Sequence, residues 1–260
     1  MRQRIITGIL MILVLGPTII YGGWLFNLVI ALLCLIGATE LLRMAKIDRT
    51  IFPSIVTYVA LLSIIFHTQI VPYIPSNLSD DSVPLVSIMV LLLSTVMVKD
   101  YEFTKAGTSV LTIFYLGLGG YAAINIREAN LALFMYILIV VFSTDIGAYF
   151  IGSKIGKRKL APNLSPNKTI EGSIGGILLA FILAAIYLSY FNFNYSYGIM
   201  LVLSIVLSIT GQFGDLIASR LKRHYQVKDA GTIFPGHGGV LDRFDSVLFT
   251  LAMAMLLGII

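Results

Sequence analysis

Long apolar runs separated by short polar segments make up most of this chain. A helix needs about 20 mostly apolar residues to cross a bilayer, and charges, Pro, Asn or Gly separate the runs. The first run is too long for a signal peptide, and no small-residue cleavage site follows it. The pattern predicts nine helices, near residues 5–22, 24–42, 53–74, 84–98, 106–126, 131–152, 173–191, 197–219 and 241–260.

The composition places these helices in a membrane. The chain has 260 residues, of which 58% are hydrophobic and 12% charged, and its mean hydropathy is +0.93. A soluble domain carries about 25% charged residues, and the segments outside nine spans are too short for a separate soluble domain. We therefore predict an all-α fold, a polytopic integral membrane protein with about nine transmembrane helices.

The basic residues predict the orientation of the helices. Loops rich in Lys and Arg stay on the cytoplasmic side of a membrane. If the N-terminus is cytoplasmic, every one of the 18 basic residues except Arg127 falls in a cytoplasmic segment. Two of these segments hold more cations than orientation requires, which indicates an anionic partner. Their cations are Lys154, Lys157, Arg158, Lys159 and Lys168 in one, and Arg220, Lys222, Arg223, Lys228 and Arg243 in the other.

Polar residues inside the spans are unevenly distributed. The spans before residue 130 hold few polar groups beyond Glu40 and His67, and we expect both of these to be structural. We therefore expect one continuous membrane domain, in which residues 1–130 form a lipid-facing scaffold and residues 131–260 carry a site that faces the cytoplasm.

Asp145 lies within the apolar sixth span, in the stretch STDIGAYFIG. A carboxylate in a span normally faces the bundle interior or a wet cavity, and it marks a functional site by default. The next stretch, SPNKTIEG from Ser165, is typical of a helix start, whose free amides attract anions. Alternatively, Thr169 is a simple N-cap and Lys168 an interfacial cation, while the glycines that follow serve helix packing.

Asp215, Ser219 and Lys222 follow one another at intervals of about one helical turn, at the end of the eighth span. They would share one face of the helix. Hard divalent cations prefer carboxylate and hydroxyl oxygens, and Lys binds phosphate, so this face suits a metal and phosphate site. The spacing leaves open that Asp215 and Lys222 only compensate each other's charge.

The ninth span is preceded by the stretch FPGHGGVLDRFD. His237 lies between glycines in a predicted tight loop. Asp242 and Asp245 share a helical face, where two ionised carboxylates repel unless a cation lies between them or beside Asp215. Acids with a divalent metal, Lys and Arg are typical of phosphoryl or nucleotidyl transfer, and the membrane setting indicates a lipid substrate.

The run from Ser219 to Asp245 resembles the signature of the phosphatidate cytidylyltransferases, the CDP-diacylglycerol synthases. It contains the family's Lys-Arg, Lys-Asp, Pro-Gly-His-Gly-Gly and Asp-Arg-x-Asp elements in order. DIGAYFIG, SPNKTIEG and GDLIAS resemble the family's upstream blocks, so the likeness covers the C-terminal half. The resemblance implies that CTP and phosphatidate react to give CDP-diacylglycerol and pyrophosphate, in phospholipid biosynthesis.

The resemblance also implies cofactors, assembly and residue roles. We expect Mg²⁺ with a second cation such as K⁺, a homodimer in the cell membrane, and no nucleic-acid partner. Asp215, Asp242 and Asp245 resemble the family's metal ligands, and together with Lys222 we expect them to be catalytic. The residues implied in substrate binding are Asp145, Ser165, Lys168, Thr169, Ser219, Arg223, His237, Gly238, Gly239 and Arg243.

Two other functions are compatible with these residues. A CTP-dependent polyprenol kinase, or a cytidylyltransferase acting on another lipid phosphate, would have similar nucleotide and metal contacts. An ion-coupled secondary transporter also has intramembrane acids and glycine-interrupted spans. Against the transporter, the polar residues gather at the cytoplasmic ends of the last four spans, with no matching cluster in the first half.

Overall fold

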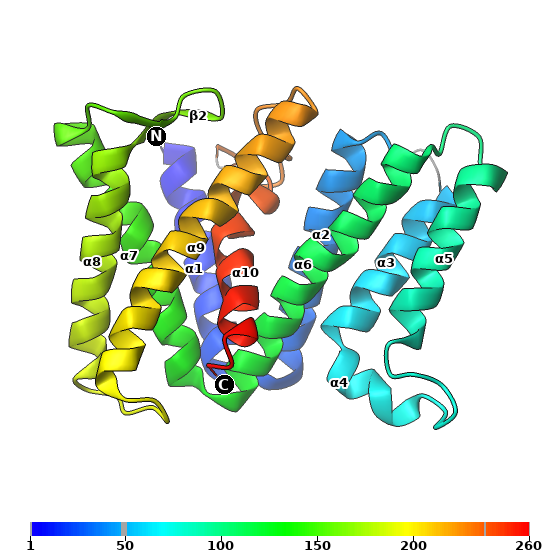
Figure 1. Ribbon diagram of the computed structural model, residues 1–260, viewed down its shortest axis with the longest axis horizontal. Helices are drawn as coiled ribbons and strands as arrows, with labels where there is room; N and C mark the ends of the chain where they lie inside the picture. Colours follow the sequence, from blue (N-terminus) through cyan, green and yellow to red (C-terminus); the bar gives the residue numbers. More distant parts are fainter. Residues whose placement is uncertain (1, 48–50, 237, 260) are drawn as a thin grey trace. The chain divides into compact units, whose positions relative to one another are not determined.

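The computed structural model describes residues 2–47, 51–236 and 238–259, and for residues 2–6 it describes the backbone alone. The chain is mostly helical (Figure 1), and helix is present in each of the nine segments where the hydropathy pattern predicts it. The helices are α1 (Arg2–Tyr21), α2 (Gly23–Met44), α3 (Ile51–Ile65), α4 (His67–Ile70), the 3₁₀ turn η1 (Val71–Tyr73), α5 (Ser82–Met97), α6 (Phe103–Ala129), α7 (Leu131–Ile155), α8 (Ile170–Leu188), α9 (Tyr197–His224) and α10 (Leu241–Leu256).

Five of the helices in the described part of the chain are long and apolar enough to cross a membrane, namely α2, α6, α7, α8 and α9. A sixth crossing results if α3 and the segment His67–Tyr73 form one span, which is bent by 84°. The pattern predicts a single helix here, but the helix is interrupted at Phe66, whose φ of −103° and ψ of 26° are not helical. The prediction of a helical membrane protein is confirmed, and the prediction of nine crossings stays a prediction.

A short β-hairpin departs from the all-α expectation. Strands β1 (Lys159–Ala161) and β2 (Ser165–Thr169) pair antiparallel. The residue before a proline favours an extended backbone, and Ser165 precedes Pro166, so the first part of the stretch SPNKTIEG forms a strand and the predicted helix start follows within the same stretch. Helix α8 begins after the strand, at Ile170.

The chain forms two compact units. Unit 1 consists of Met1–Ile124 and Val227–Arg243, and unit 2 of Asn125–Gln226 and Phe244–Ile260. Each unit therefore combines a long continuous stretch with a short segment that returns to it from near the C-terminus.

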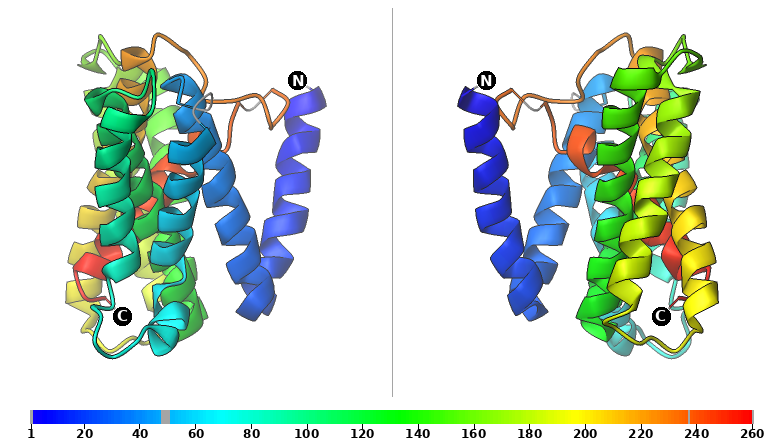
Figure 2. Two further views of the ribbon diagram at one scale, coloured as in Figure 1. Left: turned by 90° about the vertical axis from the view of Figure 1, so that its right-hand side faces the viewer. Right: turned by 90° about the vertical axis from the view of Figure 1, so that its left-hand side faces the viewer.

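Unit 1 packs through small residues and through the returning segment. A Cβ added at Gly120 of α6 would lie 2.9 Å from the Sγ of Cys34 in α2 and 3.0 Å from Ile65 in α3, so these three helices are in close contact. Cys34 is 1% exposed, which agrees with its expected role as a small packing residue. The loop that precedes α10 reaches α1 (Figure 2), where Thr7 Oγ1 donates a hydrogen bond to the carbonyl of Pro235 at 3.1 Å.

Unit 2 is built around the close approach of α7 and α8, which lie side by side in Figure 2. A Cβ added at Gly176 of α8 would lie 2.6 Å from the carbonyl oxygen of Thr144, and one added at Gly172 would lie 2.7 Å from that of Ala148. These glycines therefore serve helix packing, as small residues commonly do in membranes. Helix α9 joins the pair through Thr144 Oγ1, which donates to Ser208 Oγ at 2.7 Å.

Candidate functional site

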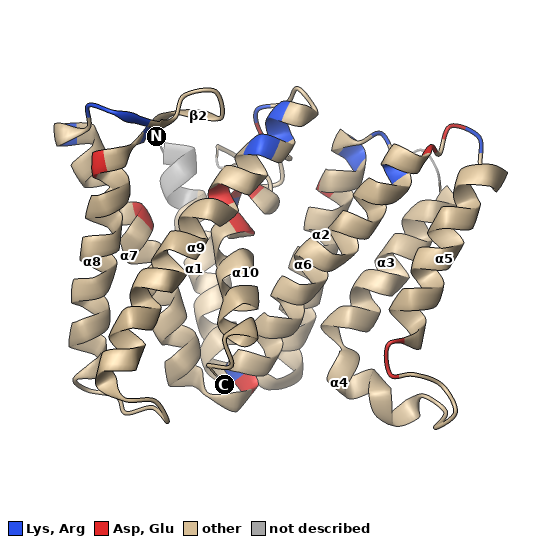
Figure 3. Ribbon diagram, viewed as in Figure 1, with Lys and Arg blue, Asp and Glu red and all other residues tan. Residues whose placement is uncertain are grey.

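Most charged residues of unit 2 lie at the end where α9 finishes and where the hairpin lies (Figure 3). The last turn of α9 carries Lys222, Arg223 and His224, and β2 carries Lys168. The hairpin and the end of α9 are more than 50 residues apart in the sequence, so the fold concentrates their positive charge.

Three acids from three different helices lie within electrostatic range of one another. Asp145 of α7 and Asp245 of α10 both interact with Asp215 of α9, and Asp245 also interacts with Asp145. Asp245 is buried, with 6% of its surface exposed. We call these three residues the carboxylate cluster. Like charges this close repel, so the cluster favours a bound cation.

The carboxylate cluster forms because α10 packs directly on α9. A Cβ added at Gly214 would lie 3.1 Å from the Asp245 carbonyl oxygen and 3.1 Å from Ser246 Cα. Glycine at this position favours so close an approach of the two backbones, because a Cβ would push its neighbours apart. The next residue on α9 is Asp215, so this packing contact brings Asp215 toward Asp245.

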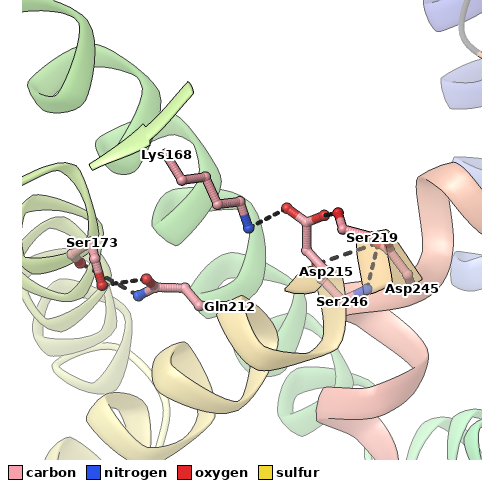
Figure 4. Close-up of polar contacts among 7 residues, drawn as sticks. All are labelled: Lys168, Ser173, Gln212, Asp215, Ser219, Asp245 and Ser246. Atoms are coloured by element: carbon pink, nitrogen blue, oxygen red, sulfur yellow. Dashed lines mark hydrogen bonds and ion pairs between the residues drawn. The ribbon is translucent and has the colours of Figure 1, made fainter. Parts of the chain in front are cut away.

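Two lysines and a serine complete the cluster. Lys168 Nζ forms an ion pair with Asp215 Oδ2, and Ser219 Oγ donates to Asp215 Oδ1 at 3.4 Å (Figure 4). Lys222 interacts electrostatically with Asp245. The side chains of Lys168 and Asp215 are 27% and 33% exposed, so both remain accessible from solvent. The cluster thus presents carboxylate oxygens, a hydroxyl and two ammonium groups together.

The hairpin that carries Lys168 is tied to the start of α8. Glu171 accepts backbone hydrogen bonds from Lys157 at 3.0 Å and from Arg158 at 3.1 Å. Thr169 is the N-cap of α8, since its Oγ1 accepts the Gly172 amide at 3.1 Å. The alternative role of Thr169, as an N-cap, is therefore confirmed. Its predicted contact with a nucleotide stays a prediction.

The glycine-rich loop, which we define as residues 228–236 and 238–240, belongs to unit 1. Several of its backbone groups form hydrogen bonds within that unit. Asp242 Oδ2 accepts the amides of Ala230 at 2.8 Å and Gly239 at 2.9 Å. The amide of Gly238 donates to the carbonyl of Phe234 at 3.1 Å. Gly238 has φ of +86°, a conformation that other residues rarely adopt. His237, a predicted binding residue, lies outside the described residues.

A cavity of about 580 Å³ opens beside this loop within unit 1. Two cations, Lys228 and Arg243, and one acid, Asp229, line it together with residues of the glycine-rich loop. The volume lies within the range of about 300–1,000 Å³ that is usual for small-molecule sites. Its chemistry suits part of an anionic ligand.

The structure divides the predicted site residues between the units. Unit 2 brings together Asp145, Lys168, Asp215, Ser219, Lys222 and Asp245. Unit 2 also contains Ser165 in β2, Thr169 at the start of α8, and Arg223 in the last turn of α9, while unit 1 contains Gly238, Gly239, Asp242 and Arg243.

Glu40, which we named from the sequence and expected to be structural, accepts backbone hydrogen bonds from Val240 and Leu241 at the end of the glycine-rich loop. Its position as an acid in an apolar span was the available signal.

The fit of a metal ion depends on how many protein ligands it needs. Within the described ranges, no group of three His, Cys, Asp or Glu side chains is arranged to hold a metal ion by itself. Mg²⁺, however, usually binds through one or two carboxylates together with waters and substrate phosphates. Asp215 and Asp245 supply carboxylates of this kind, so the residues fit a Mg²⁺ ion shared with a phosphate substrate.

Comparison with known proteins gives a consistent result over the whole chain. The cytidylyltransferase family matches residues 2–260. The phosphatidate cytidylyltransferase of Bacillus subtilis (strain 168) is 39% identical over 255 residues, which cover 96% of this chain and 95% of that protein. The phosphatidate cytidylyltransferase of Staphylococcus haemolyticus (strain JCSC1435) is 38% identical over 257 residues, covering 99% and 98%. The similarity therefore includes the first half of the chain as well as the motif-rich second half.

Proposed function

Because this chain belongs to the cytidylyltransferase family, we propose that it transfers CMP from CTP to phosphatidate, giving CDP-diacylglycerol and pyrophosphate. The observation that carries this proposal is the full-length similarity to relatives that are all named phosphatidate cytidylyltransferase. The carboxylate cluster with Lys168 and Lys222 supports it, because nucleotidyl transfer needs both kinds of charge.

In the proposed reaction, a phosphate oxygen of phosphatidate attacks the α-phosphorus of CTP. The bond between that phosphorus and the oxygen bridging to the β-phosphate breaks, and pyrophosphate leaves with the electron pair. The attacking oxygen is already anionic, so no strong general base is required. The chain's task is therefore to position the phosphates and to offset their charge, a role that we assign to Lys168 and Lys222.

We also propose that the reaction requires Mg²⁺, with Asp215 and Asp245 as the residues that would hold it. When bound, the ion supplies positive charge that stabilises the transition state and the leaving pyrophosphate. Lys168 would exchange Asp215 for a nucleotide phosphate. Asp242 stays a predicted further ligand, and we place Asp145 at the edge of the site, beside either the cytidine or a second cation such as K⁺.

The membrane arrangement that we propose has nine crossings, a cytoplasmic N-terminus and a site facing the cytoplasm. The distribution of basic residues supports this orientation. A location in the cell membrane agrees with five helices able to span a bilayer and with the bacterial relatives. The homodimer rests on the family resemblance.

A labelling experiment tests the proposed function. Purified protein in detergent is incubated with phosphatidate, Mg²⁺ and CTP labelled either in the cytidine or in the γ-phosphate. We expect the cytidine label in the lipid extract, and its loss when EDTA removes the metal. Transfer of the γ-label to lipid would indicate a kinase, and no labelled lipid at all would refute the proposed transfer of CMP to phosphatidate.

A further inference from the structure

Glu40, near the end of α2, is a buried acid in the half of the chain that was expected to be scaffold. It is 3% exposed. A carboxylate in this position is costly unless it is hydrogen-bonded. Its Oε1 accepts the amide of Val240 at 2.9 Å, and its Oε2 accepts the amide of Leu241 at 2.9 Å. Both oxygens of Glu40 therefore bind the start of α10, about 200 residues further along the chain.

The loop is shaped to receive this carboxylate. A Cβ added at Gly231 or at Gly239 would overlap the Glu40 carboxylate. Neither glycine is among the described residues with positive φ, so their backbone conformation would tolerate alanine. A methyl group at either position would therefore force the Glu40 carboxylate to move.

Glu40 and Asp242 hold the same short stretch of backbone. The amide of Gly239 donates to Asp242, and the next two amides donate to Glu40. These amides precede and begin α10, where the helix itself provides no acceptor. Arg43 lies near enough to interact electrostatically with Glu40, which helps to offset the two negative charges.

We propose that Glu40 is a positioning residue for the reaction: it fixes the glycine-rich loop and the first turn of α10, and thereby the position of Asp242. Gly231 also lines the cavity that contains Lys228 and Arg243, so Glu40 supports one wall of that cavity from behind. This inference rests on the proposed function for its kinetic consequences, but the anchoring of the loop does not depend on it.

The first test compares Glu40→Gln and Glu40→Ala with wild type. Gln keeps one acceptor oxygen and places an NH₂ group against the other amide, whereas Ala removes both acceptors. We expect kcat to fall about tenfold for Gln and about 100-fold for Ala, since a hydrogen bond to a charged group is worth about one to two factors of ten. The KM for CTP should change less than kcat, because we propose that Glu40 positions Asp242, and its hydrogen-bond partners are backbone amides rather than a cation assigned to the triphosphate, such as Lys168.

Hydrogen exchange provides a readout that does not depend on activity. Removing Glu40 should increase exchange in peptides covering residues 229–241, with little change in α7, α8 and α9. Glu102→Gln is the matched control, since Glu102 is exposed. Unchanged exchange in this loop would overturn the proposal even if the wild-type enzyme proved to have another substrate.

A double-mutant cycle tests the contact itself. Gly231→Ala should reduce kcat strongly in the wild-type background, because the new methyl group displaces Glu40. The same substitution should cost less than about twofold in the Glu40→Ala background, where the space is empty. Gly107→Ala, whose Cβ would meet nothing within 4 Å, controls for the added methyl group. Equal losses from Gly231→Ala in both backgrounds would show that Glu40 does not act through the loop.

Discussion

Replacing Lys168 by Ala tests the assignment of the carboxylate cluster to the nucleotide. Lys168 is paired with Asp215 in the structure, and both side chains are about one-third exposed. The substitution removes the cation that would meet the triphosphate. It also leaves Asp215 beside Asp145 and Asp245 with one fewer positive charge nearby, so the site should repel an incoming anion.

The expected rise in the KM for CTP can be estimated from the proposal that Lys168 exchanges Asp215 for a phosphate of CTP. A hydrogen bond between charged groups contributes about 1.5–3 kcal/mol. Because Lys168 already has a partner in Asp215, the net gain on binding CTP should lie toward the lower half of this range. About 1.5–2 kcal/mol corresponds to a rise in the KM for CTP of roughly tenfold to thirtyfold.

The assay is the rate of CMP transfer at varied CTP and saturating phosphatidate in mixed micelles. Lys168→Arg keeps the charge and should lose less than Lys168→Ala. Lys154→Ala removes an exposed lysine from the last turn of α7 and controls for the loss of one cation. A KM for CTP within about twofold of wild type in Lys168→Ala would refute this reasoning, as would an equal change in Lys154→Ala.

Three further substitutions probe the metal ligands and the packing. Asp245→Asn should lower kcat by about 100-fold or more, because it removes a buried negative charge from the carboxylate cluster, and titration of the rate with Mg²⁺ should show a higher metal requirement. Asp242→Asn should nearly abolish turnover in protein that still inserts and folds, and retention of about a tenth of wild-type activity would remove Asp242 from the metal site. Gly176→Ala should destabilise the fold by about 1–3 kcal/mol, since its Cβ would lie 2.6 Å from the Thr144 carbonyl oxygen, and thermal unfolding in detergent, compared with Gly107→Ala, measures the loss.

The local sequence was sufficient for the helices and for the motifs. An apolar run predicts a helix because the bilayer and the protein interior both exclude unpaired backbone groups, whatever lies next to the run. Helical geometry alone likewise predicts that Asp215, Ser219 and Lys222 share one face of α9, because they are spaced three or four residues apart. The break at Phe66 was missed because the residues around it are still mostly apolar. The hairpin around Lys168 was missed because its two short strands lie in a polar segment and show no regular alternation of apolar residues.

Contacts between distant segments were decided by the tertiary structure. The approach of α10 to α9 at Gly214, which brings Asp215 toward Asp245, depends on the shape of two helix surfaces that no local pattern records. Glu40 could be recognised in the sequence as an unusual acid in a span, but its partners lie about 200 residues away. A hydropathy pattern shows whether each residue favours an apolar or a polar environment. A binding site depends on which residues from distant parts of the chain are brought into contact, and only the tertiary structure shows this.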